Sequence, residues 1–273
     1  MRTFESITSP LRQGGHAIRK WVKSQLASVN ETPIFVLGNQ KSGTTAIAIL
    51  LAKRADLSVE WDLTTIERGS LINKIYRGKA SIGRLISQNR LIFSREVIKD
   101  PNITFCFSQV RERFPRAKFV MVLRHPCDNI RSILDRLGVP GNKSNIHYDR
   151  YDKIPNGWEV MLKGEWMGSE GSNYIENLAL RWKKAASIYI ENINNIEVIK
   201  YENFCSDKVA SIDNLSSRLG IERKKSIKDE VDKQFQPKGE NRGSSWRKFF
   251  EGENISKIKN ICGEEAEKLG YMW

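Results

Sequence analysis

The stretch "PIFVLGNQKSGTTAIAILLAKRA" (33–55) decides the fold. Its apolar start, which ends at Gly38, is typical of a buried parallel strand, and its apolar second half predicts a helix. Four residues separate Gly38 from Gly43, as in the phosphate-binding loop G-x-x-x-x-G-K-[ST]. The residue after Gly43 is a threonine, however, and Lys41 lies inside the loop. The stretch therefore predicts a strand, an anion-binding loop and a helix, with the lysine in an unusual place.

Predicted strands and helices alternate along the rest of the chain. Strands are expected at 57–63, 95–100, 117–123 and 197–201, and helices at 16–29, 65–90, 102–114, 126–138, 173–193 and from 202 onward except at 236–245. Residues 139–172 are the least regular region. This alternation predicts one domain over residues 1–273, a three-layer α/β/α fold with a central, mostly parallel sheet.

The composition favours an anionic ligand. The 273 residues are 40% hydrophobic and 28% charged, and 45 Lys+Arg against 32 Asp+Glu give a net charge of +13. A positive field attracts nucleotides, sulfated or phosphorylated glycans and acidic lipids, although it also serves solubility alone. No aromatic and basic recognition motif for RNA or DNA is present, so we expect no nucleic-acid partner.

Features of the N-terminus and the cysteines suggest a cytoplasmic protein. Residues 1–15 lack the apolar core of a signal peptide, and no apolar run approaches the ~20 residues of a membrane span. The four cysteines are widely spaced without a C-x-x-C pair, which is typical of reduced thiols and argues against a zinc site. Within the N-terminal extension 1–30, residues 16–29 predict a basic amphipathic helix that either docks on the domain or contacts a membrane peripherally. No feature indicates an oligomeric state.

The predicted loop carries the groups that an anion site needs. Backbone N–H groups and the dipole at the start of a helix favour negative charge. Lys41 adds a mobile cation, and Thr44 and Thr45 add hydroxyl groups in the first helical turn. The alternative is a helix that Ser42 or Thr44 only caps.

The residues "KSGTT" (41–45), placed directly after an apolar strand, resemble the 5′-phosphosulfate loop of sulfotransferases that use 3′-phosphoadenosine 5′-phosphosulfate (PAPS). The resemblance implies the P-loop NTPase-like sulfotransferase fold. It also implies that Lys41, Ser42, Gly43, Thr44 and Thr45 hold the phosphosulfate group. It further requires a second site for the 3′-phosphate, which in that family is an arginine at the end of a strand and a serine eight residues later.

Arg124 and Ser132 in "FVMVLRHPCDNIRSIL" match this second site. Arg124 ends a predicted strand at the edge of the sheet where open α/β folds bind ligands. Ser132 follows two turns into the next helix. A P-loop kinase or ATPase would favour an acidic magnesium ligand after such a strand, so we expect a reaction that requires no metal. A structural salt bridge is the alternative role for Arg124.

Two further segments extend the resemblance. "VIKYENF" is similar to the family's Tyr-Glu-Asp stretch, which implies that Tyr201 lies near the adenine. "QPKGENRGSSWRKFF" resembles the segment that folds over the nucleotide, and it implies contacts of Lys238 and Gly239 with the 3′-phosphate. Pro237 replaces the arginine of that segment. Trp246 and Phe249 are candidates to hold the adenine.

The resemblance implies sulfuryl transfer from PAPS to a hydroxyl or amine, with adenosine 3′,5′-bisphosphate as product. The base that takes the acceptor proton stays open. Asp100 stands where many members carry a histidine, and Glu60 follows the loop helix as the glutamate of carbohydrate sulfotransferases does. His125 and His147 are further candidates, and Asp100 has the alternative role of capping the helix after Pro101.

The acceptor is expected to be a small molecule, a glycan or a lipid. The irregular region 139–172 is the predicted acceptor cover, because it contains Tyr148, Tyr151, Trp158 and Trp166. Two alternatives remain: a P-loop kinase-like phosphotransferase and a non-catalytic protein that binds nucleotides or other anions.

Overall fold

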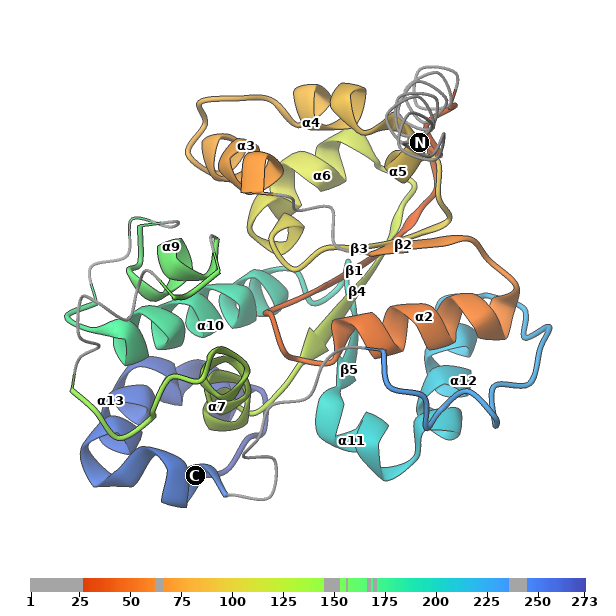
Figure 1. Ribbon diagram of the computed structural model, residues 1–273. Helices are drawn as coiled ribbons and strands as arrows, with labels where there is room; N and C mark the ends of the chain where they lie inside the picture. Colours follow the sequence, from red (N-terminus) through yellow and green to blue (C-terminus); the bar gives the residue numbers. More distant parts are fainter. Residues whose placement is uncertain are drawn as a thin grey trace, which may run out of the picture.

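The computed structural model describes residues 27–61, 66–144, 153–155, 157–165, 168, 171–235 and 245–273. One sheet contains the parallel strands β1 (Ile34–Gly38), β2 (Val59–Trp61), β3 (Val97–Lys99), β4 (Lys118–Leu123) and β5 (Glu197–Lys200). Their order is β2-β3-β1-β4-β5, so β1 lies at the centre (Figure 1). The chain leaves β1 toward β2 on one side and leaves β4 toward β5 on the other. The carboxyl ends of β1 and β4 therefore flank the point where open α/β sheets bind ligands.

Helices cover both faces of the sheet (Figure 1). They are α2 (Thr44–Ala55), α3 (Ile66–Tyr76), α4 (Ile82–Gln88), α5 (Arg90–Phe93), the 3₁₀ helix η2 (Ile103–Cys106), α6 (Phe107–Arg113), α7 (Pro126–Leu137), α9 (Trp158–Leu162), α10 (Tyr174–Glu191), α11 (Tyr201–Ser206), α12 (Lys208–Arg218) and α13 (Trp246–Lys268). Helices α2, α11 and α12 lie on one side of the sheet, and α7, α10 and α13 lie on the other. The predicted three-layer α/β/α architecture is confirmed.

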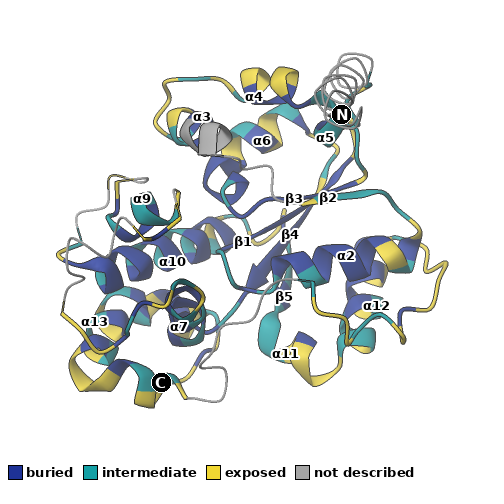
Figure 2. Ribbon diagram, in the orientation of Figure 1, coloured by how far each residue is buried: buried dark blue, intermediate teal, exposed yellow. Residues whose placement is uncertain are grey.

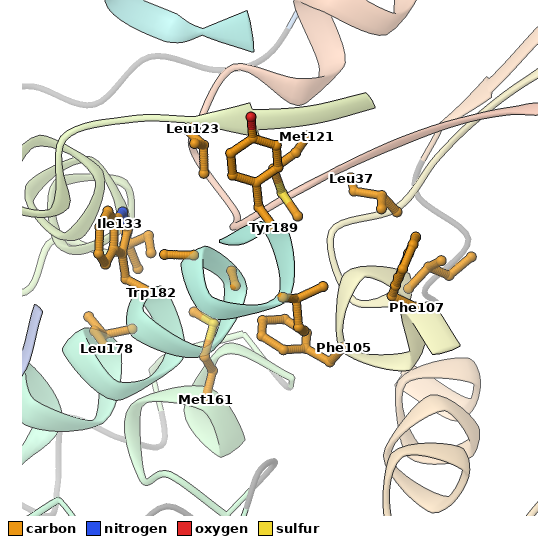
Figure 3. Packing of buried hydrophobic residues seen from close by; sticks show 14 of the residues in the cluster. Leu37, Phe105, Phe107, Met121, Leu123, Ile133, Met161, Leu178, Trp182 and Tyr189 are labelled. Atoms are coloured by element: carbon orange, nitrogen blue, oxygen red, sulfur yellow. The ribbon is translucent and has the colours of Figure 1, made fainter. Parts of the chain in front are cut away.

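Side chains of the central strands alternate between two hydrophobic cores. Phe35 and Leu37 of β1 belong to the core with α7, α10 and α13, whereas Ile34 and Val36 belong to the core with α2 and α12. All four are buried, as is expected of a parallel strand covered on both faces (Figure 2). Figure 3 shows the first core from close by, with Leu37 and side chains of β4 beside those of α10.

Two predicted helices differ from the structure. The expected helix at 102–114 is divided into η2 and α6. Its first turn is tied to the sheet, because the Thr104 hydroxyl accepts from the Gly38 N–H (2.9 Å) and donates to the Gly38 carbonyl (3.2 Å). Residues 219–235 form turns and irregular segments rather than a helix. Two N–H groups there donate to the Arg54 carbonyl at the end of α2, which directs this backbone away from helical bonding.

The N-terminal extension lies mostly outside the described residues. Residues 27–30 form neither helix nor strand, so the helix predicted at 16–29 does not extend to its expected end. Within the described segments, no helix is both long and apolar enough to cross a membrane.

Candidate functional site

The loop between β1 and α2 has a backbone that only glycine fits at two positions. A Cβ on Gly38 (φ 141°) would lie 2.6 Å from the Val122 carbonyl oxygen. Gly43 stands at the N-cap of α2 with φ 92° and ψ 7°, and a Cβ there would lie 2.3 Å from Cδ2 of Tyr201. Because Gly43 has no side chain to cap the helix and the first turn holds no acidic residue, the start of α2 suits an anion.

Lys41, Arg124 and Tyr201 come from three different strand ends and meet at this loop. Lys41 has a positive φ of 63°, a conformation that costs a residue with a side chain about 1–2 kcal/mol. The Lys41 carbonyl accepts a hydrogen bond of 2.8 Å from Nη1 of Arg124. The Arg124 guanidinium in turn lies over the Tyr201 ring, 4.6 Å from its centroid. Burial lowers the pKa of Arg124 from its ordinary value, and the Tyr201 phenol opposes this shift.

The other loop residues of the prediction lie in the first turn of α2 or directly before it. Ser42, Thr44 and Thr45 are buried. Ser132 is half-buried on α7, two turns after Arg124. The structure thus brings Lys41 to Thr45, Arg124 and Tyr201 together, with Ser132 on the helix that Arg124 precedes.

A buried asparagine that sequence reasoning missed fastens the loop. Asn129, on α7, is fully buried. Its amide Nδ2 donates to the Gln40 carbonyl (2.7 Å) and to the Ser42 hydroxyl oxygen (3.0 Å). Its Oδ1 accepts from Nδ2 of Asn39 (2.8 Å), and Oδ1 of Asn39 accepts from the Gln40 N–H (3.0 Å). Both backbone polar groups of Gln40 are therefore held by asparagine side chains.

A buried arginine, also missed, holds the side chain of Gln40. Arg181 of α10 donates to Oε1 of Gln40 through Nε (3.0 Å) and Nη2 (2.9 Å), and Nη2 also contacts Oδ1 of Asn102 at 2.8 Å. Its guanidinium lies 4.1 Å from the centroid of the Phe105 ring. Burial lowers the pKa of Arg181 to about 9, and the charge of Asp100 opposes the shift. The network connects the loop to β3, because the Asn102 N–H donates to Oδ1 of Asp100 at 2.7 Å.

The two candidate carboxylates occupy different surroundings. Asp100 is buried directly after β3, where its side chain caps the turn that leads into η2. Glu60 is half-exposed on the edge strand β2, and its Oε2 lies 3.9 Å from Nε of Arg95, which precedes β3. Asp100 is therefore the carboxylate linked to the loop, through Asn102 and Gln40.

His125 ties the C-terminal residues to the site. Its Nε2–H donates to the Met272 carbonyl (3.0 Å), and its ring stacks on Trp246 at 5.4 Å. Its backbone N–H donates to a carboxylate oxygen of Glu202 at 2.8 Å. Burial lowers the pKa of the imidazole, against the opposing effect of the Met272 carbonyl. The ring thus packs between the start of α7 and the start of α13.

Several predicted residues have another partner or lie outside the described residues. Trp246 stacks on His125, and the Phe249 ring packs against Gly141, where a Cβ would lie 2.4 Å from it. Trp158 begins α9 and packs against the larger core. Outside the described residues lie Lys238, Gly239, His147, Tyr148, Tyr151 and Trp166. Among the described residues, no group of three or more His, Cys, Asp or Glu could hold a metal ion.

Solved structures similar to this chain include sulfotransferases. A sulfotransferase from Mycobacterium avium is 10% identical in sequence with a TM-score of 0.58, and the match covers 94% of this chain and 81% of that one. A sulfotransferase from Mycobacterium tuberculosis H37Rv is 11% identical with a TM-score of 0.52, over 91% of this chain and 81% of that one. No protein-family model matches the chain, and no curated protein matches it in sequence. At these identities the likeness shows the fold, so the predicted sulfotransferase fold is confirmed.

Proposed function

We propose that the protein transfers a sulfuryl group from PAPS to a hydroxyl or amine acceptor. The observation that carries this proposal is the meeting of a glycine-bounded loop, Arg124 and Tyr201 at the carboxyl edge of the sheet. The sulfotransferase fold supports it.

The residues of the site fit the nucleotide donor. The N–H groups at the start of α2, together with Lys41 and the Thr44 hydroxyl, are suited to the 5′-phosphosulfate group. Arg124, with Ser132 on the following helix, is suited to the 3′-phosphate, and Tyr201 to the adenine. Lys238 and Gly239 belong to this proposal through their sequence resemblance alone.

The chemistry requires charge stabilisation and a proton acceptor. When bound, the donor supplies the sulfuryl group, whose sulfur bonds to the acceptor oxygen or nitrogen as its bond to the 5′-phosphate oxygen breaks and adenosine 3′,5′-bisphosphate leaves with the electron pair. Lys41 and the loop N–H groups stabilise negative charge on the transferring and leaving oxygens. A carboxylate takes the acceptor proton, and we assign that role to Asp100 rather than Glu60. Its position beside the loop supports the assignment.

The acceptor classes in this proposal are small molecules, glycans and lipids. All four cysteines are free thiols, which supports a reducing compartment, and we place the protein in the cytoplasm. Peripheral contact of the N-terminal basic segment with a membrane remains part of the proposal.

Binding and transfer measurements on the full chain test this function. We expect calorimetry to show tighter binding of adenosine 3′,5′-bisphosphate than of AMP, and little binding of ATP. Labelled PAPS should then transfer to a member of an alcohol, phenol, glycan or lipid panel in the presence of excess EDTA. Preferential binding of magnesium–ATP would favour the kinase-like alternative, and binding without transfer to any acceptor would favour the non-catalytic one.

The assignment of Asp100 has its own variant. Asparagine caps a turn as well as aspartate does, so Asp100→Asn keeps the bond to the Asn102 N–H but removes the base. We expect Asp100→Asn to lose transfer while the chain still unfolds cooperatively, at a somewhat lower temperature because the buried Arg181 loses the charge of Asp100. Glu60→Gln should retain transfer. Normal transfer by Asp100→Asn would limit Asp100 to capping.

A further inference from the structure

The hydrogen bonds around Asn129 fix the direction of every group in them. The Gln40 carbonyl can only accept, so the side-chain nitrogen of Asn129, and not its oxygen, faces this carbonyl. The Gln40 N–H can only donate, so the oxygen of Asn39 faces it and the nitrogen of Asn39 points to Asn129. The two side-chain amides and the Gln40 peptide therefore form one closed ring of donors and acceptors with a single consistent orientation.

The orientation of the Asn129 amide also determines how the Ser42 hydroxyl group is hydrogen-bonded. The same Asn129 nitrogen donates to Ser42 Oγ at 3.0 Å, so the hydroxyl oxygen accepts this bond and its proton turns elsewhere. Among the described residues, no other side chain or backbone group is hydrogen-bonded to the Ser42 side chain. Ser42 directly precedes Gly43 at the start of α2, where the helix favours an anion.

We propose that Asn129 is a positioning residue of the anion site, because it holds the Gln40 peptide and turns the Ser42 proton toward the bound 5′-phosphate. The inference rests on the proposed function, since the anion that it serves is the 5′-phosphate end of the nucleotide. Asn129 does not touch the ligand. It acts through Ser42, and its bond to the Gln40 carbonyl holds the Asn129 amide in the orientation that directs the Ser42 proton.

The position of Asn129 also connects the two phosphate sites. Helix α7, which begins two residues after Arg124, carries both Asn129 and Ser132. Asn129 and Arg124 bond to consecutive loop carbonyls, those of Gln40 and Lys41. The start of α7 thus fixes the position of the loop proposed for the 5′-phosphate relative to Arg124, which is proposed for the 3′-phosphate.

Asn129→Leu tests the inference, because leucine has the same branched shape as asparagine but no donor or acceptor. We expect calorimetry to show AMP binding weakened by roughly ten- to hundredfold, the cost of losing a hydrogen bond to a charged group. Binding of adenosine 3′-phosphate, which lacks the 5′-phosphate, should change by less than about twofold. The matched control is Asn254→Leu. Asn254 is also buried and donates to two carbonyls, those of Gly141 and Lys143, so its loss should lower stability without changing either affinity.

A double-mutant cycle with Ser42→Ala separates the positioning role from a general loosening of the loop. If Asn129 acts through Ser42, Asn129→Leu weakens AMP much less in the Ser42→Ala background than in the wild type. Equal losses in both backgrounds would overturn the inference, as would wild-type AMP affinity in Asn129→Leu, and both leave the proposed function standing. A wild-type chain that binds neither AMP nor adenosine 3′,5′-bisphosphate overturns the function and the inference together. If Asn129→Leu does not fold, Asn129→Ser in the same cycle serves instead.

Discussion

Gly43→Ala should disable the nucleotide site by two separable effects. The first is the backbone, because φ of 92° is a left-handed conformation that costs a residue with a Cβ about 1–2 kcal/mol. The second is a collision, because the new Cβ would lie 2.3 and 2.4 Å from two ring carbons of Tyr201. Arg124 lies over that ring and donates to the loop, so the ring cannot shift without disturbing the site.

The expected loss of nucleotide affinity follows from the backbone cost and the collision. The backbone term alone corresponds to a roughly 5- to 30-fold weaker affinity for adenosine 3′,5′-bisphosphate, if binding requires the native loop. The collision adds to it, so we expect Gly43→Ala to weaken binding by more than about 30-fold in the wild-type chain. In a Tyr201→Ala background the collision is gone, and the further loss from Gly43→Ala should return to the backbone value.

Isothermal calorimetry on the wild type, Gly43→Ala, Tyr201→Ala and the double variant measures the backbone cost and the collision separately. Thermal unfolding shows that each of these proteins is folded. An equal effect of Gly43→Ala in both backgrounds would refute the contact between Tyr201 and the loop. Undiminished affinity in Gly43→Ala would refute the requirement for the left-handed backbone at the start of α2.

Three other changes test the site. Lys41→Ala should lower single-turnover transfer by orders of magnitude while changing the affinity for the product nucleotide much less, and Lys41→Arg should not restore transfer. A Lys41 variant that binds the nucleotide poorly yet transfers normally at saturating PAPS would show that Lys41 only binds the nucleotide. Arg124→Ala should weaken adenosine 3′,5′-bisphosphate by about 2–4 kcal/mol more than AMP in calorimetry, and equal losses would contradict its role at the 3′-phosphate. The pKa of His125 is lowered from 6.5 in the folded chain, so the unfolded chain binds more protons at this residue. The free energy of unfolding therefore falls as pH drops below about 6.5. His125→Asn should reduce this loss in thermal unfolding scans, and an unchanged pH profile would contradict the lowered pKa of His125.

Local patterns in the sequence were sufficient for the layers, for the loop between β1 and α2 and for the place of Arg124 after β4. The strand before the loop, the helix after it and the position of Arg124 depend on residues close together in the chain, so periodicity and spacing predict them. The helix predicted at 126–138 is confirmed as α7, which begins at Pro126 and ends before the left-handed Gly138.

Side chains that support the loop from a distance could not be predicted this way. Asn129 and Arg181 reach Gln40 across 89 and 141 residues of sequence, and no local spacing encodes such contacts. Each has a weak signal in the sequence, because each is a polar residue among buried apolar neighbours, Ile130 and Ile133 in α7 and Leu178 and Trp182 in α10. A buried polar residue needs a partner, but only the fold identifies Gln40 as that partner.

The central place of β1 has a consequence for hydrogen exchange. Each residue of β1 pairs with a strand on at least one side, and Ile34, Phe35 and Val36 pair on both. Backbone amides in such a strand exchange with solvent only when most of the sheet opens, whereas the short edge strand β2, paired with β3, opens at a lower free energy. The loop that holds Lys41 is an extension of β1. Partial opening that releases β2 and Glu60 would therefore leave in place the strand from which the loop starts.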